Sequence, residues 1–316
     1  MWSPDSELDS FEVRTLELPD LPTYNGEQEG SLCATVIRRN PPASPQAVLY
    51  VHGWSDYFFQ RHLADEMAAL GYDFYAIDLH RYGRSLRPGH LAGFTTDLSE
   101  YFDELNRAAE LVADEGHGEI VVMGHSTGGL VASLWADANP GRVKAIVLNS
   151  PWLELQGYPA LRPAIAPMLT AVGQLNPLAA FPVAELGFYR RSIHAGQDGE
   201  WTYNENFKGD RAFMVRVGWL AAIMAGQATV AAGLSIDVPI MVALSKRTVI
   251  PRKWGEELKK ADIVLDVERL ASRAAFLGNH VTLVRIADGL HDLTLSAPPV
   301  REAFFDVLAR WLSAYG

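Results

Sequence analysis

Cysteine and basic side chains are both scarce in this chain of 316 residues. The single cysteine, Cys33, cannot form an internal disulfide bond and cannot supply a cysteine-rich metal site. Because 27 Lys and Arg residues stand against 38 Asp and Glu residues, the formal net charge is −11. This acidic balance disfavours nucleic acid and anionic membrane surfaces as partners.

Long runs of purely apolar residues are also lacking. Two uncharged stretches, 163–184 and 217–236, are long enough to cross a bilayer. The first holds four prolines, and the second is rich in Ala and Gly with polar residues between them, so neither is typical of a membrane span. The amino terminus is acidic and lacks the basic and apolar regions of a signal peptide. We therefore expect a cytoplasmic protein without a transmembrane segment.

What the chain does contain is an alternation of short apolar runs and helical patterns at both ends. Strands are predicted at 11–18, 32–39, 47–52, 72–78, 120–123, 143–149, 239–245 and 281–286. Helices are predicted at 60–70, 97–115, 127–138, 267–277 and 301–313, with Thr96 as the cap of the second. The first two strands suggest an antiparallel start, and the later alternation predicts a mostly parallel sheet with helices on both faces.

The alternation breaks in the middle of the chain. Between 155 and 234 no clean apolar strand occurs, and helical segments, prolines and aromatic residues take its place. We interpret residues 1–154 and 235–316 as one α/β core and residues 155–234 as an inserted helical cap. Because ligands of open α/β sheets bind at the carboxyl ends of the strands, the cap is expected above that edge.

One motif in the core carries a candidate nucleophile. Residues 124–128 read Gly-His-Ser-Thr-Gly, preceded by an apolar run and followed by Gly129 and an apolar helical pattern. A strand, a sharp turn and a helix are the context in which Gly-Xaa-Ser-Xaa-Gly exposes a reactive serine. Ser126 is therefore the candidate nucleophile, and the backbone N–H of Thr127 can face a developing oxyanion.

A serine nucleophile needs a base, and the base needs an orienting acid. His291 follows the last predicted strand, in a loop that opens on the same edge as the Ser126 turn, and is the candidate base. The acid should lie between Ser126 and His291, beyond the strand 239–245. Asp262 is favoured there, and Asp266 is an alternative although its place before a helix also suits a cap. The further carboxylates that stay open are Asp237 and Asp288.

The loop after the first core strand, His52-Gly53-Trp54, should complete the site. The N–H of Trp54 is the candidate for the second oxyanion-hole donor, and Gly53 allows the backbone to approach closely. His52 is expected to bond neighbouring backbone. The residues expected to contact a substrate are Gly53, His125, Trp152 and Trp219.

These residues together resemble the α/β-hydrolase superfamily, in particular its monoacylglycerol lipase and lysophospholipase-like branch, which is often filed with the serine aminopeptidases. The matching motifs are HGW at 52–54, DLHRYGRS at 78–85, GHSTGG at 124–129 and HD at 291–292. The resemblance implies an α/β-hydrolase fold, and the order Ser126, Asp262, His291 agrees with that of the family. Two features depart from it: His80 and Arg81 replace Arg and Gly, and Asp262 comes 17 residues after Ser245, so the segment between them must loop out and return.

The expected function is a serine hydrolase that cleaves carboxylic esters through a Ser-His-Asp triad and an acyl-enzyme, without a metal or an organic cofactor. The aromatic cap suggests lipophilic acyl, monoacylglycerol-like or lysophospholipid-like substrates. The alternatives on the same fold are a thioesterase, a lactonase, an aminopeptidase or an acyltransferase, and from another class a non-catalytic ligand-binding protein. The partner is then a small ester, no nucleic acid is expected, and a homodimer stays open as the assembly.

Overall fold

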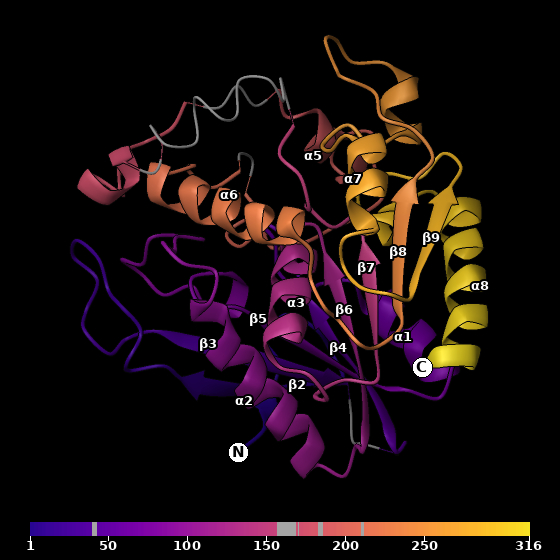
Figure 1. The fold of residues 1–316 in the computed structure, drawn as a ribbon, viewed down its shortest axis with the longest axis horizontal. Helices are drawn as coiled ribbons and strands as arrows, with labels where there is room; N and C mark the ends of the chain where they lie inside the picture. The colour runs from indigo at the N-terminus through magenta and orange to yellow at the C-terminus, as the bar shows by residue number, and fades with distance from the viewer. Residues whose placement is uncertain (40–42, 157–168, 170, 183–185, 210–211) are drawn as a thin grey trace.

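A nine-stranded sheet runs through the computed structural model, which describes residues 1–39, 43–156, 169, 171–182, 186–209 and 212–316 (Figure 1). The strand order is β1-β2-β3-β5-β4-β6-β7-β8-β9. The strands are β1 (Ser3–Pro4), β2 (Phe11–Glu17), β3 (Cys33–Arg39), β4 (Gln46–Val51), β5 (Asp73–Asp78), β6 (Glu119–His125), β7 (Ala145–Asn149), β8 (Ile240–Ser245) and β9 (Val281–Ile286). The α-helices are α1 (Arg61–Ala69), α2 (Glu100–Asp114), α3 (Thr127–Ala138), α5 (Phe188–Ile193), α6 (Val217–Ala232), α7 (Val267–Ala274) and α8 (Pro298–Tyr315).

The direction of the strands divides the sheet into two parts. β1, β2 and β3 pair antiparallel, and β3 also pairs antiparallel with β5. From β5 through β4, β6, β7 and β8 to β9 every pairing is parallel. The antiparallel start and the mostly parallel sheet are therefore confirmed, and the carboxyl ends of the parallel strands meet at one edge.

Alternation within the strands decides which helices cover which face. In β4, Val48 and Tyr50 join one hydrophobic cluster and Leu49 and Val51 join the other, as expected where successive side chains point to opposite faces. The first cluster also holds buried residues of α1 and α8, and the second holds those of α2, α3 and α7. The inner strands β4 to β8 are consequently buried on both sides, which is typical of a parallel sheet.

Two predicted helix starts differ from the structure. α2 begins at Glu100 with Ser99 at its cap position, and Thr96 does not cap it, because the Thr96 hydroxyl is hydrogen-bonded to the Tyr24 hydroxyl at 2.9 Å. The closing helix α8 begins at Pro298, three residues before the predicted start. A proline is tolerated in the first helical turn because the N–H that it lacks would have no partner within the helix.

The turn in which His80 and Arg81 depart from the family keeps a glycine-like backbone. Arg81 has φ = 65°, in the left-handed region, although it carries a large side chain. That side chain is fully buried, pairs with Glu27 at 2.6 Å and donates to the backbone oxygens of Phe94 and Pro22 at 2.8 Å. His80 is buried beside Glu104 and bonds to it. The buried partners hold a conformation that usually favours glycine.

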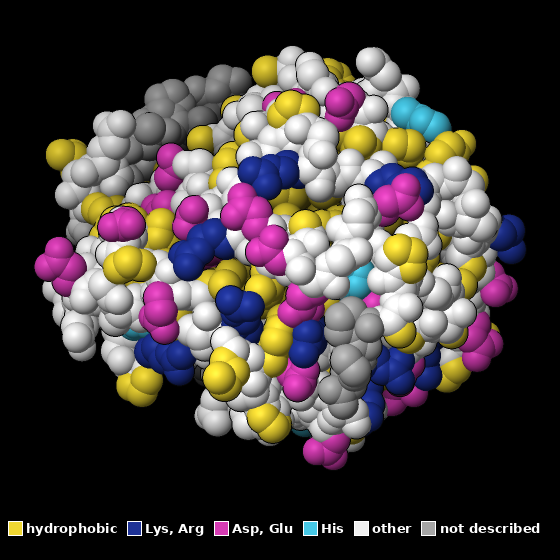
Figure 2. Space-filling model, turned by 90° about the horizontal axis from the view of Figure 1, so that it is seen from below, with side chains coloured by type: hydrophobic (Ala, Val, Ile, Leu, Met, Phe, Trp, Pro, Cys, Tyr) yellow, Lys and Arg dark blue, Asp and Glu magenta, His cyan; other side chains and the backbone are white. Residues whose placement is uncertain are grey.

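The described residues between 155 and 234 lie above the carboxyl edge of the strands, where α6 crosses over α3 (Figure 1). α6 coincides with most of the uncharged stretch 217–236, while much of the stretch 163–184 lies outside the described residues. Within the described part of the chain, no helix is long and apolar enough to span a bilayer. The opposite face of the molecule, turned toward the viewer in Figure 2, intersperses Lys and Arg with Asp and Glu side chains.

Candidate active site

Ser126 stands at the sharp turn between β6 and α3 and has φ = 52° and ψ = −117°. A Cβ on Gly124 would lie 2.7 Å from the Gly128 carbonyl oxygen, and one on Gly128 would clash with the carbonyl oxygens of Val51 and His52. The turn therefore requires glycine on both sides of the serine. A non-glycine residue with a positive φ is strained, and such strain is found at functional sites where surrounding structure enforces it.

Three side chains form one hydrogen-bonded chain at this turn. His291 Nε2 lies 3.0 Å from Ser126 Oγ, and His291 Nδ1 lies 2.9 Å from Asp262 Oδ2. Because a carboxylate only accepts hydrogen bonds, Nδ1 carries the proton and Nε2 is free to accept the Ser126 hydroxyl proton. All three side chains are buried, with Asp262 fully so. The structure thus brings together the three residues that the sequence predicted as nucleophile, base and orienting acid, and these roles stay a prediction.

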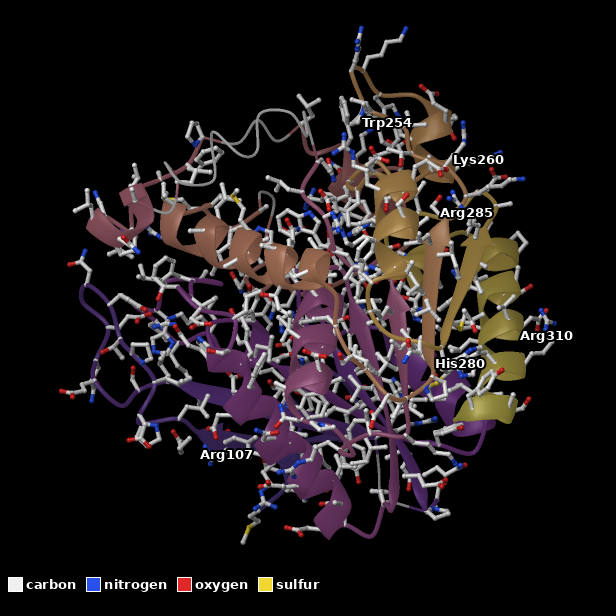
Figure 3. All side chains as sticks on the ribbon, in the orientation of Figure 1. Arg107, Trp254, Lys260, His280, Arg285 and Arg310 are labelled. Carbon is white, nitrogen blue, oxygen red and sulfur yellow. The ribbon has the colours of Figure 1, made fainter. Side chains whose placement is uncertain are left out.

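The long excursion between β8 and Asp262 returns the acid to the end of the strand. Thr248 and Asp262 form a parallel bridge, in which the Val249 N–H donates to the Asp262 oxygen and the Asp262 N–H donates to the Arg247 oxygen, each at 3.0 Å. The intervening residues rise above β8, where Trp254 and Lys260 are labelled in Figure 3. Asp262 thus lies at the strand end despite its distance from Ser245 in the sequence.

The carboxylate of Asp262 is fixed by backbone donors as well as by the histidine. Its Oδ1 accepts the N–H groups of Val264 at 2.8 Å and Leu265 at 2.7 Å, so both oxygens have partners. Asp266 has a different role, because its side chain accepts from the Glu268 and Arg269 N–H groups at the start of α7. The carboxylate that bonds His291 is that of Asp262.

The loop after β4 passes directly against the nucleophile. A Cβ on Gly53 would lie 3.1 Å from Ser126 Cβ and 3.1 Å from a ring carbon of His125, so only glycine lets the loop come this close. His52 donates from Nδ1 to the Gly53 oxygen at 2.8 Å and accepts the Leu79 N–H at Nε2 at 3.1 Å. His52 therefore holds the backbone of the loop, as expected, next to the candidate oxyanion donor Trp54.

A buried polar network behind His291 was missed at the level of the sequence. Asp292 is buried and accepts the Asn149 amide at 2.7 Å and the Thr294 N–H and hydroxyl at 2.9 and 2.7 Å. Burial acts to raise the pKa of Asp292, but nearby His125 and these donors outweigh it, so this pKa lies below its usual range. The only sequence signal was the position of Asp292 directly after the candidate base.

His125 belongs to this network and not to the reacting group. Its Nδ1 lies 3.1 Å from the Asn149 oxygen, and its ring centre lies 4.9 Å from that of His291. Burial lowers the pKa of His125, with Asp292 opposing that effect. The position of His125 beside the base fits a supporting residue better than direct substrate contact, which was the sequence-based expectation for it.

The two tryptophans expected to contact a substrate meet a third. The ring of Trp219, from α6, lies 3.7 Å centre to centre from Trp54 and 5.8 Å from Trp152. Trp219 is 2% exposed, and the backbone N–H of Trp152 donates to the Ser126 carbonyl oxygen at 2.9 Å. We call Trp54, Trp152 and Trp219 the indole wall.

Two residues from the segment predicted to form a cap, Asn204 and Lys208, bond to the loop that carries Trp54. Lys208 and the buried Asp56 form an ion pair at 2.6 Å, and the Asn204 N–H donates to the Tyr57 hydroxyl at 2.7 Å. On the other side of the site, the hydroxyl of Tyr189 accepts the Asp292 N–H at 3.3 Å, and its ring meets His291 edge-on at 5.7 Å.

Two surface hollows lie away from the triad. One of about 370 Å³ is lined by residues of α2, α3 and α6, and one of about 500 Å³ is lined by residues of α7 together with Glu154. Neither is lined by Ser126, His291 or Asp262. Among the described residues, no group of three or more His, Cys, Asp and Glu side chains is arranged to hold a metal ion.

Comparison with known proteins finds similarity to several lipases. Lipase LipV of Mycobacterium tuberculosis is 33% identical over 145 residues, covering 46% of this chain and 51% of that protein. The monoacylglycerol lipase of Mycolicibacterium smegmatis is 27% identical, with 46% and 51% covered, and the human (lyso)-N-acylphosphatidylethanolamine lipase is 28% identical, with 58% and 60% covered. The chain therefore matches between half and three fifths of the length of these relatives.

Solved structures share the fold at low identity. A monoglyceride lipase from Saccharomyces cerevisiae has a TM-score of 0.64 at 14% identity, with 94% of each chain covered. A carboxyl esterase from Bacillus coagulans has a TM-score of 0.63 at 12% identity, with 96% of this chain and 98% of that chain covered. These likenesses show the α/β-hydrolase fold that the sequence predicted.

A family model described as "Serine aminopeptidase, S33" matches residues 42–250, which is more than half of the chain. The match spans the loop of Trp54 and the turn of Ser126 and ends in the excursion that leads to Asp262. This chain belongs to the S33 serine aminopeptidase family of α/β-hydrolases.

Proposed function

We propose that this chain is a serine hydrolase that cleaves carboxylic esters. The observation that supports this most directly is the hydrogen-bonded series Asp262–His291–Ser126 at a strained, glycine-flanked turn. Each member has the protonation role that its partners allow, because Asp262 only accepts and His291 donates to it from Nδ1. The names of the relatives, which are lipases, point to the same reaction class.

In the proposed reaction, His291 Nε2 takes the proton of the Ser126 hydroxyl while Oγ forms a bond to the ester carbonyl carbon. The carbonyl oxygen becomes an oxyanion, which the N–H groups of Trp54 and Thr127 would stabilise. His291 then gives its proton to the leaving alcohol as the carbon–oxygen bond breaks, which leaves an acyl-enzyme. A water molecule, deprotonated by His291, repeats these steps and releases the acid and free Ser126.

We further propose that the substrate is a small lipophilic ester of the monoacylglycerol or lysophospholipid kind. The indole wall offers an apolar surface next to Ser126, and two relatives carry such substrates in their names. Residues 155–234 act as the cap over the site in this proposal, and residues 1–154 and 235–316 act as the core. Fractionation of cells that express the chain would test the cytoplasmic location that we also propose.

The family name raises the alternative of an aminopeptidase, which would need a free carboxylate to hold the substrate amine. Three acidic cap residues that could serve are each paired with an arginine: Asp198 with Arg191 at 2.5 Å, Glu200 with Arg301 at 2.6 Å and Glu205 with Arg190 at 2.6 Å. The fourth, Glu185, lies outside the described residues. Cleavage of esters is therefore favoured over removal of amino-terminal residues.

Hydrolysis of p-nitrophenyl esters by purified variants tests the proposal. We expect Ser126→Ala and His291→Ala to lower kcat by roughly 10³-fold to 10⁶-fold, and Asp262→Asn by roughly 10⁴-fold through the wrong histidine tautomer. Asp266→Asn should keep the wild-type rate. A folded Ser126→Ala protein that retains turnover would contradict the proposal, and a wild-type protein that binds esters without cleaving them would support the non-catalytic alternative.

A further inference from the structure

The indole wall approaches the nucleophile from two loops and one helix. Gly53, directly before Trp54, lies against Ser126, and the backbone N–H of Trp152 donates to the Ser126 carbonyl oxygen at 2.9 Å. Trp219, from α6, bridges the two loops, because its ring lies 3.7 Å from that of Trp54 and 5.8 Å from that of Trp152. The two loops that carry Trp54 and Trp152 thus contact the nucleophile residue through their backbones, and Trp219 joins the three indoles into one aromatic wall on this side of the turn.

Further aromatic side chains pack against the indole wall and restrict its movement. A Cβ on Gly93 would lie 2.7 Å from a ring carbon of Trp54 and 2.9 Å from one of Phe213, so both rings press on that backbone. The Trp54 ring also meets Phe213 edge-on at 5.8 Å and Tyr82 at 6.1 Å. Moving the Trp54 indole would therefore displace a second layer of aromatic rings.

Helix α6 is held just as closely. A Cβ on Gly226 would lie 2.8 Å from Leu98 Cδ1 and 2.9 Å from Leu134 Cδ1, so α6 packs onto its neighbours at a glycine. One residue on, Gln227 Nε2 donates to the Trp152 carbonyl oxygen at 3.0 Å. These contacts fix the position of α6 relative to the turn of Ser126. They therefore also fix the position of Trp219, which α6 carries.

The chemistry of the proposed reaction assigns this side of the site to the acyl group. His291 must protonate the departing alcohol, so the alcohol has to lie on the histidine side of Ser126. The rings that neighbour His291 are His125 at 4.9 Å and Tyr189 at 5.7 Å, and neither belongs to the wall. The group that remains on the carbonyl carbon therefore extends toward the indoles.

We propose that the indole wall closes the acyl side of the site and restricts the substrate to esters of short or compact acids. This inference rests on the proposed ester hydrolysis and narrows the substrate class proposed above to those of its members that carry a short or compact acyl group. An extended acyl chain would need the volume that the Trp54 and Trp219 rings fill, and these rings cannot move without α6 and the aromatic layer behind them. A short or compact acyl group can instead pack on the indole faces.

The test compares kcat/KM along p-nitrophenyl esters of increasing acyl length, from acetate to dodecanoate. For the wild type we expect kcat/KM to fall as the chain lengthens beyond butyrate. Trp219→Ala should raise the octanoate-to-acetate ratio of kcat/KM by about tenfold or more, since each methylene accommodated by an apolar pocket contributes measurably to specificity. Where Trp219→Ala fails to fold, Trp219→Leu and Trp152→Ala open the same space less drastically.

Trp201→Ala is the matched control, because this cap tryptophan stacks on His62 at 4.3 Å and donates to the Leu295 oxygen, away from the wall. We expect it to leave the ratio unchanged. A wild type that prefers octanoate or longer esters, or folded and active wall variants with an unchanged ratio, would overturn the acyl limit alone. A wild type that hydrolyses no ester of the series would overturn the proposed function and the acyl limit together.

Discussion

The turn that carries Ser126 and the cap segment 186–209 both contact the region of the loop 53–57, but through different kinds of interaction. At the turn, backbone meets backbone, and glycines at 124 and 128 are required because any Cβ would clash. The cap segment is joined instead by side chains, above all by the ion pair of Lys208 with Asp56. The first arrangement comes from one short motif, whereas the second depends on partners more than 150 residues apart.

Because of this difference, we expect substitutions to have different effects in the two regions. At Gly124 and Gly128 no side chain larger than hydrogen fits, so substitutions at these two positions should abolish the structure that catalysis needs. In the cap, single contacts can be removed and compensated, so substitutions should give graded losses of stability. The predictions below test that contrast.

The largest effect is expected at Gly128. A Cβ added at this position would clash with the carbonyl oxygens of Val51 and His52. These are backbone atoms, which cannot move aside as the end of a flexible side chain can. Gly128→Ala should therefore either prevent folding or destabilise the protein by more than about 3 kcal/mol and abolish ester hydrolysis. Gly118→Ala is the matched control, because a Cβ there meets nothing within 4 Å. Chemical denaturation and activity assays measure both, and a stable, active Gly128→Ala protein would contradict the account of the turn.

Removal of the cap–loop ion pair should have the next largest effect. Lys208→Met leaves the carboxylate of Asp56, which is 2% exposed, buried without its partner. Breaking a buried pair in this way typically costs about 3–5 kcal/mol. Lys144→Met provides the comparison, because Lys144 and Glu119 are 36% and 48% exposed and solvent screens such a surface pair, so its loss should change stability little.

The double variant Asp56→Asn/Lys208→Met distinguishes the pair from simple loss of packing. If the cost arises from an isolated buried charge, removing that charge should restore much of the stability lost in Lys208→Met. If Lys208→Met and Lys144→Met lower the free energy of unfolding by the same amount, the ion pair of Lys208 with Asp56 does not hold the cap segment in place.

Sequence reasoning succeeded where the determinants are local. The motif at 124–128 predicted the turn and the start of α3, and the apolar runs predicted the core strands to within about two residues. The pairing of His291 with Asp262 also followed the expected order, although its catalytic role remains a prediction. The structure explains the long gap before Asp262 by its bridge to Thr248, which no local pattern contains.

Features that depend on distant partners could not be predicted. The left-handed backbone at Arg81 is held by Glu27, more than 50 residues earlier in the chain, and no turn pattern signals it. The stack of Trp54 on Trp219 joins a loop to helix α6, whereas the sequence nominated the two residues separately, Trp54 as an oxyanion-hole donor and Trp219 as a substrate contact. The wrong cap at Thr96 has the same origin, because Tyr24 engages its hydroxyl.

A smaller effect, which is present at neutral pH and disappears in acid, is expected from Glu27. Burial raises the pKa of Glu27, but the hydrogen bonds from Arg81 and from the N–H groups of Leu91 and Tyr24 outweigh it and lower the pKa to about 2. A carboxyl whose pKa is lower in the folded state adds stability above its ordinary pKa, and that stability is lost as the pH falls toward 2. Glu27→Gln should therefore be less stable than wild type at neutral pH, and the gap should narrow between about pH 4.5 and 2. A gap that is constant across this range in urea denaturation would contradict the role of the charge.

The smallest effect is expected at Asp266, which caps α7. Its side chain accepts from the Glu268 and Arg269 N–H groups, and replacing such a cap by alanine costs about 1 kcal/mol. Asp266→Ala should lower the free energy of unfolding by that amount and leave ester hydrolysis unchanged. A large loss of activity would instead assign Asp266 to the reaction and contradict the choice of Asp262.

The central claim is that Ser126 is an activated nucleophile, and covalent labelling tests it most directly. A fluorophosphonate probe reacts with a serine that an adjacent base activates, and mass spectrometry identifies the modified residue. We predict labelling of Ser126 alone in the wild type, and no labelling in Ser126→Ala or His291→Ala. A folded wild-type protein in which Ser126 stays unmodified, or in which another residue takes the label, would contradict the claim.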